Sequence, residues 1–390
     1  MNKLLRRNES VKQEESEYVL FKQTTIVKLL KVLIAVNLVM TVLMTLRNIG
    51  LSSFSINNLW NEFLNGLENP GLQYDSKVNS ENLFGGNILA PLSTLTAPFL
   101  WPVLPLSIIY FKKINVFNKG LVLLTIIIES VRWISTGTNK GIIDLILIIL
   151  SVLFLKQLQK SFHLSNKIKA RKRKVVAVTI IAMILVIIGL SVFQNNISSR
   201  INNNYGTVSA ITNNTIINTK SPIMKIMPET LHPLVIYVTS YLTQGYYGLS
   251  LALDEPYIPM FGVGNSYFLI SNFEGLLSKD IWKNTFQARL AYEGWNPFVN
   301  WHSIYTWLAN DFSFLGVLII MFYLGKYFAV VCYKSIVQKD SITSVILCLL
   351  FICFFYFSCN NQVLSMPSTF MAFWGINIYW FYKSKIKRRG

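Results

Sequence analysis

Charged residues are scarce in this chain of 390 residues. Only 14% of its residues are Asp, Glu, Lys or Arg, whereas 52% are hydrophobic. A soluble domain carries about 25% charged residues, so this composition excludes an ordinary water-exposed surface. The chain is therefore predicted to be an all-α polytopic integral membrane protein.

Ligand-binding motifs are also missing. The chain has no CxxC pair, no HExxH motif and no Asp-x-Asp pair, so neither a metal nor another cofactor is indicated. It also lacks a GxGxxG after a strand and a GxxxxGK[ST], which argues against nucleotide binding. The four cysteines fall in or beside apolar runs and are expected to act as small packing residues: Cys332, Cys348, Cys353 and Cys359.

Eight apolar runs dominate what is present. Most approach the roughly 20 residues that cross about 30 Å of hydrocarbon as a helix, although the third and fourth runs are shorter and need flanking residues or little tilt. The predicted spans are Ile26–Leu46, Ile88–Phe111, Gly120–Ser135, Gly141–Leu155, Val175–Phe193, Phe312–Tyr333, Ile342–Cys359 and Val363–Tyr382.

The positive charges indicate how the chain is oriented. The formal net charge is +18, and Lys167–Lys174 looks like a nucleic-acid-binding patch. With eight crossings and both termini inside, however, 25 of the 36 Lys and Arg residues fall on the cytoplasmic side, together with only 5 of the 18 acids. This positive-inside asymmetry explains the charge without a nucleic-acid partner. The chain is then one membrane domain (1–390) with a cytoplasmic arm (1–25) and a cytoplasmic tail (383–390).

Three segments are expected on the extracytoplasmic face: 47–87, 194–231 and 232–311. The first contains an amphipathic piece, Ile56–Leu67, that fits a membrane surface, and the second is predicted to be a polar, mobile loop. The third, a large loop, holds two apolar stretches, Pro233–Leu253 and Tyr257–Leu277. Because a single crossing there would place the later basic loops outside, the pair is either a re-entrant hairpin, which is favoured, or a transmembrane pair.

Ionisable pairs stand at the outer ends of the third and fourth runs. Glu129 and Arg132 are spaced i,i+3, and Lys140 and Asp144 are spaced i,i+4, so mutual neutralisation is one interpretation. Ionisable groups this close to hydrocarbon also tend to face protein or water. The equally weighted alternative is a cationic rim of Arg132 and Lys140 that binds a lipid phosphate. Arg200, beyond the fifth run, is more simply a snorkelling side chain.

The segment Gln287–Gly316 combines ionisable and aromatic side chains directly before an apolar run. Arg289 and Glu293 are spaced i,i+4, which by itself predicts a weak surface ion pair. Aromatic residues near a membrane are commonly interfacial anchors, but their faces also pack against sugar rings. His302 fits a base, a phosphate donor or a hydrogen-bonding wall residue. The sugar-binding candidates are Trp295, Trp301, Tyr305 and Trp307.

Within this segment, His302–Gly316 (HSIYTWLANDFSFLG) resembles the loop signature of the Wzy-type O-antigen and capsular polysaccharide polymerases. It departs from that signature where Ser303 replaces Asn and Ser313 replaces the first Gly. The matching residues are His302, Tyr305, Asp311 and Gly316.

Two further places carry the same resemblance. Gly137–Gly141 (GTNKG) is similar to a small-residue turn of that family, with Lys140 where Arg is common. Arg200 stands where the family tends to keep an outer arginine. The resemblance implies a fold similar to GT-C-like polymerases and ligases in a bacterial cytoplasmic membrane.

The implied reaction is metal-independent glycosyl transfer on the outer face, which joins polyprenyl-pyrophosphate-linked oligosaccharide repeat units into a surface polysaccharide. The bilayer, a flippase and a chain-length regulator are the implied partners. Such a reaction needs cations for the pyrophosphate and a base for the acceptor hydroxyl.

Four cations are expected to bind pyrophosphate: Arg132, Lys140, Arg200 and Arg289. As base, His302 and Glu293 rank above Asp311, which is expected to cap a helix starting at Phe312. A ligase that uses the same lipid-linked donor remains an alternative. A flippase is the alternative from another class, and it predicts inverted repeats and charges near mid-membrane.

Overall fold

The computed structural model describes residues 2–50, 55–81, 88–163, 168–200, 217–218, 220–297 and 299–389, and no strand occurs among them. Five helices in these ranges are long and apolar enough to cross a membrane: Thr24–Ile49, Leu89–Ile109, Lys140–Phe162, Val176–Arg200 and Ile304–Ile336. The prediction of an all-helical membrane protein is therefore confirmed, while the predicted number of eight crossings stays a prediction.

Every predicted span coincides with a helix or a broken helix. They are α1 (Asn2–Ile49), α4 (Leu89–Leu100) with α5 (Val103–Ile109), α6 (Val116–Ser135), α7 (Lys140–His163), α8 (Ile168–Arg200), α13 (Ile304–Ile336), α14 (Ser341–Tyr356) and α16 (Pro367–Arg389). The second run is broken between α4 and α5, where Pro102 lacks the amide hydrogen that a continuous helix needs.

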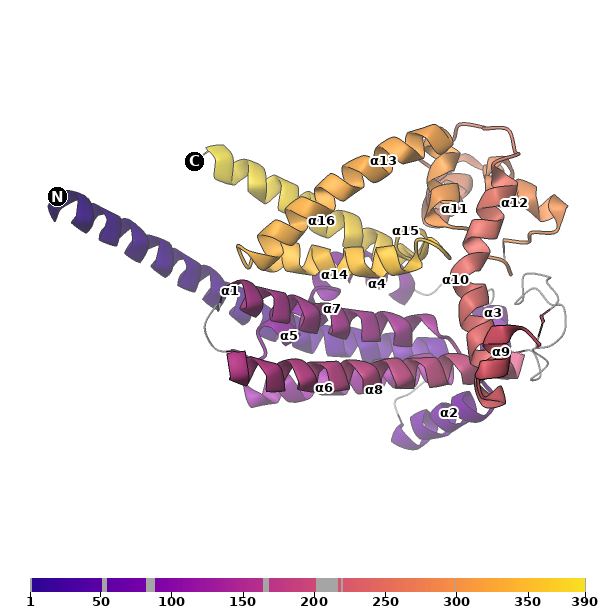
Figure 1. Cartoon of the computed structure of the whole chain (residues 1–390), viewed down its shortest axis with the longest axis horizontal. Coiled ribbons are helices and arrows are strands. Elements are labelled where there is room, and N and C mark those ends of the chain that lie inside the picture. The colour runs from indigo at the N-terminus through magenta and orange to yellow at the C-terminus, as the bar shows by residue number, and fades with distance from the viewer. Residues whose placement is uncertain are drawn as a thin grey trace.

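The chain termini lie at the same end of this bundle, at the left of Figure 1. Contacts between distant segments define that end. Lys156 Nζ donates to the carbonyl of Ile108 at 2.7 Å, and Gln159 Nε2 donates to the carbonyl of Ser335 at 2.8 Å. We call this the basic end, because it carries Lys112, Lys113 and Lys339 in its turns.

The apolar core centres on α14. Most of its side chains are buried, since α7, α13 and α16 cover it. A helix that is apolar all round is stable only when it is surrounded in this way, by protein or by lipid. The members of this core that are fully shielded from solvent are Val331, Ile346, Leu349, Leu350 and Ala372.

Shorter helices gather at the opposite end, which we call the site end (Figure 1). They are α2 (Ile56–Glu68), α3 (Pro70–Glu81), α9 (Pro222–Ile226), α10 (His232–Ala252), α11 (Tyr267–Leu277), α12 (Phe286–Leu290) and α15 (Gln362–Ser365). The predicted amphipathic piece is α2, and its apolar side chains Ile56 and Trp60 are 75% and 58% exposed. Its position on a membrane surface stays a prediction.

The second outer segment differs from its prediction. α8 continues to Arg200, and α9 forms before His232, so much of 194–231 is helical where the structure describes it. The physical reason is that Asn195 and Asn196 bond to neighbouring segments: the side-chain amide of Asn195 donates to the carbonyl of Leu67, and that of Asn196 donates to Asn139. The predicted mobile loop falls mainly on 201–216, outside the described residues.

The two apolar stretches of the third segment form α10 and α11. α10 runs across the end of the bundle (Figure 1) and packs against α8 and α13. The second stretch becomes helical only at Tyr267, because residues 257–265 form a loop held by Asp311. α10 is not among the five helices apolar enough to span, and whether the pair enters the membrane stays a prediction.

The helix predicted to start at Phe312 starts at Ile304 instead, so the capping role given to Asp311 was wrong. α13 is broken at Ser313, whose backbone has φ 59° and ψ 168°. The amide of Gly316 lies 3.5 Å from Ser313 Oγ, so Ser313 caps the second part of the helix. Gly316 fits there because an added Cβ would meet Phe312 at 2.8 Å.

Candidate functional site

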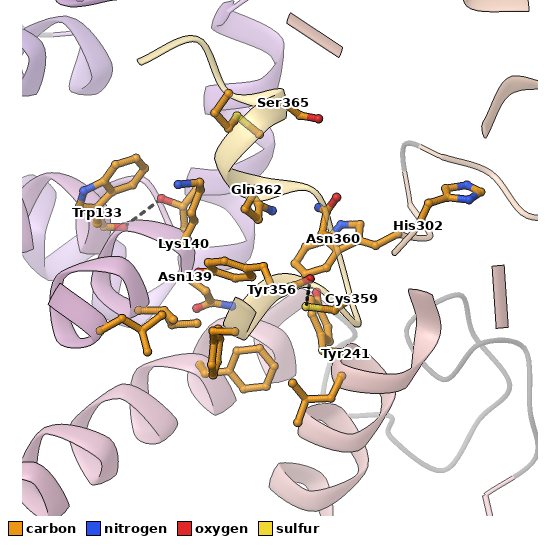
Figure 2. Close-up of a pocket in the computed structure, with 18 of the residues that line it drawn as sticks. Trp133, Asn139, Lys140, Tyr241, His302, Tyr356, Cys359, Asn360, Gln362 and Ser365 are labelled. Atoms are coloured by element: carbon orange, nitrogen blue, oxygen red, sulfur yellow. Dashed lines mark hydrogen bonds between the residues drawn. The ribbon is translucent and has the colours of Figure 1, made fainter. Parts of the chain in front are cut away.

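A cavity of about 880 Å³ lies at the site end, between α3, α7, α8, α10, α11 and α15. Figure 2 shows side chains from three distant parts of the chain around it: Trp133 to Lys140, Tyr241, and Tyr356 to Ser365. The cavity therefore depends on contacts between elements that are far apart in sequence.

Three cations line this cavity: Lys77, Lys140 and Arg200. The guanidinium of Arg200 donates to the carbonyl of Gly137 at 2.7 Å and lies 3.7 Å from the ring centre of Tyr74. Lys140 Nζ lies 2.5 Å from the carboxylate of Asp144. The cations come from α3, α7 and α8, and two of the four predicted pyrophosphate-binding residues, Lys140 and Arg200, line the same cavity.

The turn Gly137–Gly141 makes this convergence possible. Gly137 has φ +59° and sits against the backbone of Pro70, where a side chain would collide. An added Cβ at Gly141 would overlap the indole ring of Trp133. The predicted small-residue turn is thus a structural turn between α6 and α7 that lets α3 and Trp133 come close.

Aromatic side chains form another part of the wall. Trp301 packs edge-on against Tyr241, with ring centres 4.8 Å apart. Burial raises the pKa of Tyr241, which lies beside Arg200, so its hydroxyl stays protonated at neutral pH. Of the four predicted sugar-binding residues, Trp301 and Trp307 line the cavity.

A third part of the wall is apolar and belongs to two of the long apolar helices. It is formed by Ile143, Ile146, Leu147 and Leu150 of α7 and by Val186, Gly189, Leu190 and Phe193 of α8. Much of α8 is exposed, including Ile184 at 51% and Ile187 at 62%. The cavity is therefore amphipathic, with cations at the bundle end and a hydrocarbon wall along α7 and α8.

The predicted ion pairs are both present. Arg132 binds Glu129, and its guanidinium lies 4.6 Å from the ring centre of Trp133. Arg132 does not line the cavity, whereas Lys140 does. Lys140 is thus both paired with Asp144 and part of the cavity lining, so the two interpretations are compatible for this residue. Arg132 lies behind the lining and contacts Trp133, which lines the cavity.

Arg289 and Glu293 are not brought together, so the predicted i,i+4 pair was wrong. Arg289 instead bonds Glu255 at 2.5 Å, and Glu293 is exposed in a 3₁₀ turn. The chain turns at Gly294, which has φ +87°, and Arg289 points to the loop after α10. Neither residue lines the cavity.

His302 contributes to the cavity lining, but its ring is directed away from the other labelled side chains (Figure 2). It lies against Gly248 with the indole of Trp295, and among the described residues neither ring nitrogen has a hydrogen-bond partner. Burial lowers the pKa of His302 to about 3, so the imidazole is neutral at physiological pH.

The other predicted residues of this segment have packing roles. Trp295 is buried in an apolar core with Leu290 and Ile304, and Tyr305 packs against the same core. Asp311 accepts hydrogen bonds from the amides of Gly262 and Gly264 at 2.7 and 3.0 Å. These residues shape the loops beside the cavity and do not line it.

Several lining residues were not predicted from the sequence. Tyr74 and Lys77 lie in an acidic, Asn-rich segment, where only their one-turn spacing on a helix gave a signal. Tyr241 lies within the apolar stretch Pro233–Leu253, and Trp282 lies in a short charged turn, and neither place gave a signal. No carboxylate lines the cavity among the described residues, and no group of three metal-ligating side chains occurs there.

Comparisons with known protein families, with curated proteins and with solved structures find no match to this chain. What the site can do therefore follows from its geometry. Cations, aromatic faces and a hydrocarbon wall in one cavity fit an amphiphile that has an anionic head and an apolar tail.

Proposed function

We propose that the protein is a glycosyltransferase that joins polyprenyl-pyrophosphate-linked oligosaccharides into a polysaccharide on the outer face of a bacterial cytoplasmic membrane. One observation carries this proposal: Lys77, Lys140 and Arg200 line the same cavity as apolar side chains of α7 and α8. A soluble anion would not need the hydrocarbon wall, and an ordinary phospholipid would not need the tryptophans.

The chemistry follows from the two ends of this cavity. The bond between the anomeric carbon and the pyrophosphate oxygen breaks, and the polyprenyl pyrophosphate leaves with the electron pair. A bond forms between that carbon and an acceptor hydroxyl, whose proton passes to solvent water. Lys77, Lys140 and Arg200 stabilise the charge that grows on the leaving pyrophosphate.

The lipid tail would lie along α7 and α8. Gly189 gives this path room, because an added Cβ there would come within 2.8 Å of Ile146. Since α8 is largely uncovered by protein, the tail can reach the bilayer sideways without passing through the bundle. Trp301 and Trp307 provide the faces against which the first sugar packs.

Binding and polymer formation test this proposal together. Purified protein is titrated with polyprenyl pyrophosphate in detergent micelles, and the gene is deleted and restored with variants in its host. Arg200→Ala should weaken binding about tenfold to a hundredfold, because a charge-assisted phosphate contact is worth about 1.5 to 3 kcal/mol. It should also leave single lipid-linked units unjoined.

Lys225→Ala is the matched control, since Lys225 is an exposed cation at the same end and does not line the cavity. Unchanged binding by Arg200→Ala in folded protein would reject the assignment of the cavity. If Arg200→Ala cells make polymer of normal length but no longer attach it to a different acceptor, the ligase alternative is favoured.

A further inference from the structure

A second hollow, of about 410 Å³, adjoins the cavity. Tyr267 and Trp282 line both spaces, so they form the boundary between them. The hollow is completed by Glu274 and Ser278 at the end of α11 and by Lys279 and Asp280 in the turn that follows. This places carboxylates directly beyond a cavity whose described lining has none.

The shared aromatic wall is continuous between the two spaces. Trp282 packs perpendicular to Tyr267, with ring centres 5.5 Å apart, and lies 6.1 Å from Trp307 of the cavity. Tyr267 is 45% exposed. A row of aromatic faces thus extends from the cavity to the surface, and such faces pack well against the C–H groups of sugar rings.

The two carboxylates are held in fixed orientations. Glu274 Oε1 accepts hydrogen bonds from the amides of Ile281 and Trp282 at 2.8 and 2.6 Å. Asp280 Oδ1 accepts from the amide of Lys283 at 3.2 Å. These bonds use one oxygen of each carboxylate. The second oxygen of each group is held in place by them and can accept a hydrogen bond from a hydroxyl group.

The backbone beside these groups is strained. Ser278 adopts the left-handed conformation, with φ 51° and ψ 37°, at a helix end where glycine is usual. Strain of this kind is retained where the surrounding structure needs it, and it concentrates at binding sites. At Ser278 it turns the chain so that Asp280 faces the same hollow as Glu274.

We propose that this hollow is the subsite for the saccharide that leaves the cavity, and that it takes uncharged, hydroxyl-rich sugar units. This proposal rests on the proposed function. Trp282 and Tyr267 would stack on successive rings, and Glu274 and Asp280 would accept hydrogen bonds from their hydroxyls. The lining of the hollow has two carboxylates and one cation, Lys279, so its net negative charge repels anionic sugars.

Polymer length in restored deletion cells tests the subsite. Trp282→Ala and the double variant Glu274→Gln, Asp280→Asn should each give polymer with a shorter modal length. With purified protein, the concentration of lipid-linked oligosaccharide for half-maximal rate should rise about fivefold for Trp282→Ala, because one aromatic contact is worth about 1 kcal/mol. In the double variant, whose two residues do not line the cavity, binding of polyprenyl pyrophosphate, which lacks sugar, should stay within twofold of the unaltered protein.

Matched controls lie at the same end of the molecule. Tyr292→Ala removes an aromatic ring that is 93% exposed, and Asp254→Asn removes an exposed carboxylate; neither residue lines either space. If Trp282→Ala and the double variant keep the normal length while Arg200→Ala loses polymer, the subsite is wrong and the proposed function stands. If deletion of the gene leaves the polymer unchanged, the proposed function itself fails.

Discussion

Arg200 and Arg289 show how differently two arginines of one membrane protein can be placed. The guanidinium of Arg200 is held by one carbonyl and the face of Tyr74 beside an open cavity. That of Arg289 is paired with Glu255, and both side chains are less than 20% exposed. The first is arranged to meet a ligand, and the second already has its counterion.

Removal of Arg289 should therefore act on stability. Arg289→Ala leaves the carboxylate of Glu255 without its partner, and breaking a buried pair costs about 3 kcal/mol. We expect a lower melting temperature in detergent, with pyrophosphate binding retained by the folded fraction. Adding Glu255→Gln should recover part of the loss. Binding lost in folded Arg289→Ala, with no recovery in the double variant, would support the direct contact predicted from the sequence.

His302 gives a pH-dependent prediction. Its folded pKa is about 3, whereas an imidazole in the unfolded chain has a pKa near 6.5. The unfolded chain therefore binds the additional proton between these values, and the free energy of unfolding falls as pH drops below about 6.5.

The slope from this one group is at most about 1.4 kcal/mol per pH unit. Thermal unfolding of His302→Gln between pH 6.5 and 4 should show a smaller loss than that of the unaltered protein. Equal slopes for the two proteins would mean that His302 is not buried as a neutral imidazole.

At the scale of elements, α13 is broken beside the loops of the site end. Ser313 ends one helical part and caps the next. Just before the break, the carboxylate of Asp311 accepts from the amides of Gly262 and Gly264, and its carbonyl accepts from the hydroxyl of Tyr257.

Asp311→Asn tests that connection. The substitution keeps the size of the side chain and removes the charge that accepts from Gly262, Gly264 and Asn265. Weakening a set of charge-assisted bonds should cost about 1 to 3 kcal/mol of stability. Thermal unfolding and limited proteolysis of the loop provide the measurement. Unaltered protease resistance would show that other contacts hold the loop.

Substitutions at two glycines test how closely α6 and α7 pack. Gly141→Ala should displace the ring of Trp133, because the new methyl group would overlap it, and so lower both stability and pyrophosphate binding. Gly120→Ala meets no atom within 4 Å. That control should be neutral or raise stability by up to about 1 kcal/mol, since alanine favours helices. Identical behaviour of the two variants would contradict the close packing of α6 and α7.

At the scale of the whole molecule, accessibility tests the topology. Cysteines introduced at Lys220 and Tyr292 should react with a membrane-impermeant maleimide in intact cells. Cysteines at Lys112 and Lys339 should react only after permeabilisation, because these exposed positions lie at the basic end. The native Cys348, Cys353 and Cys359 are buried. If only one of the positions 220 and 292 reacts in intact cells, the segment between them crosses the membrane an odd number of times and the predicted topology is wrong.

The sequence predicted the helices well because long apolar runs leave few alternatives in a bilayer. It located Lys140, Arg200, Trp301 and Trp307 through charge and aromatic content near helix ends. It did not predict that α3 brings Tyr74 and Lys77 to the same place, since that depends on the close approach at Gly137. The partner of Arg289 was missed for a similar reason: a contact between distant loops leaves no periodic pattern.

The lining of the cavity begins at Tyr74 and ends at Pro367. During synthesis, the cationic side chains of α3, α7 and α8 therefore emerge long before α15 and the start of α16 can close the space. A nascent or truncated chain that ends before α15 lacks this wall. The assembled cavity is therefore a property of a chain that has been synthesised through the start of α16, and shorter nascent chains present the three cations without the opposite wall.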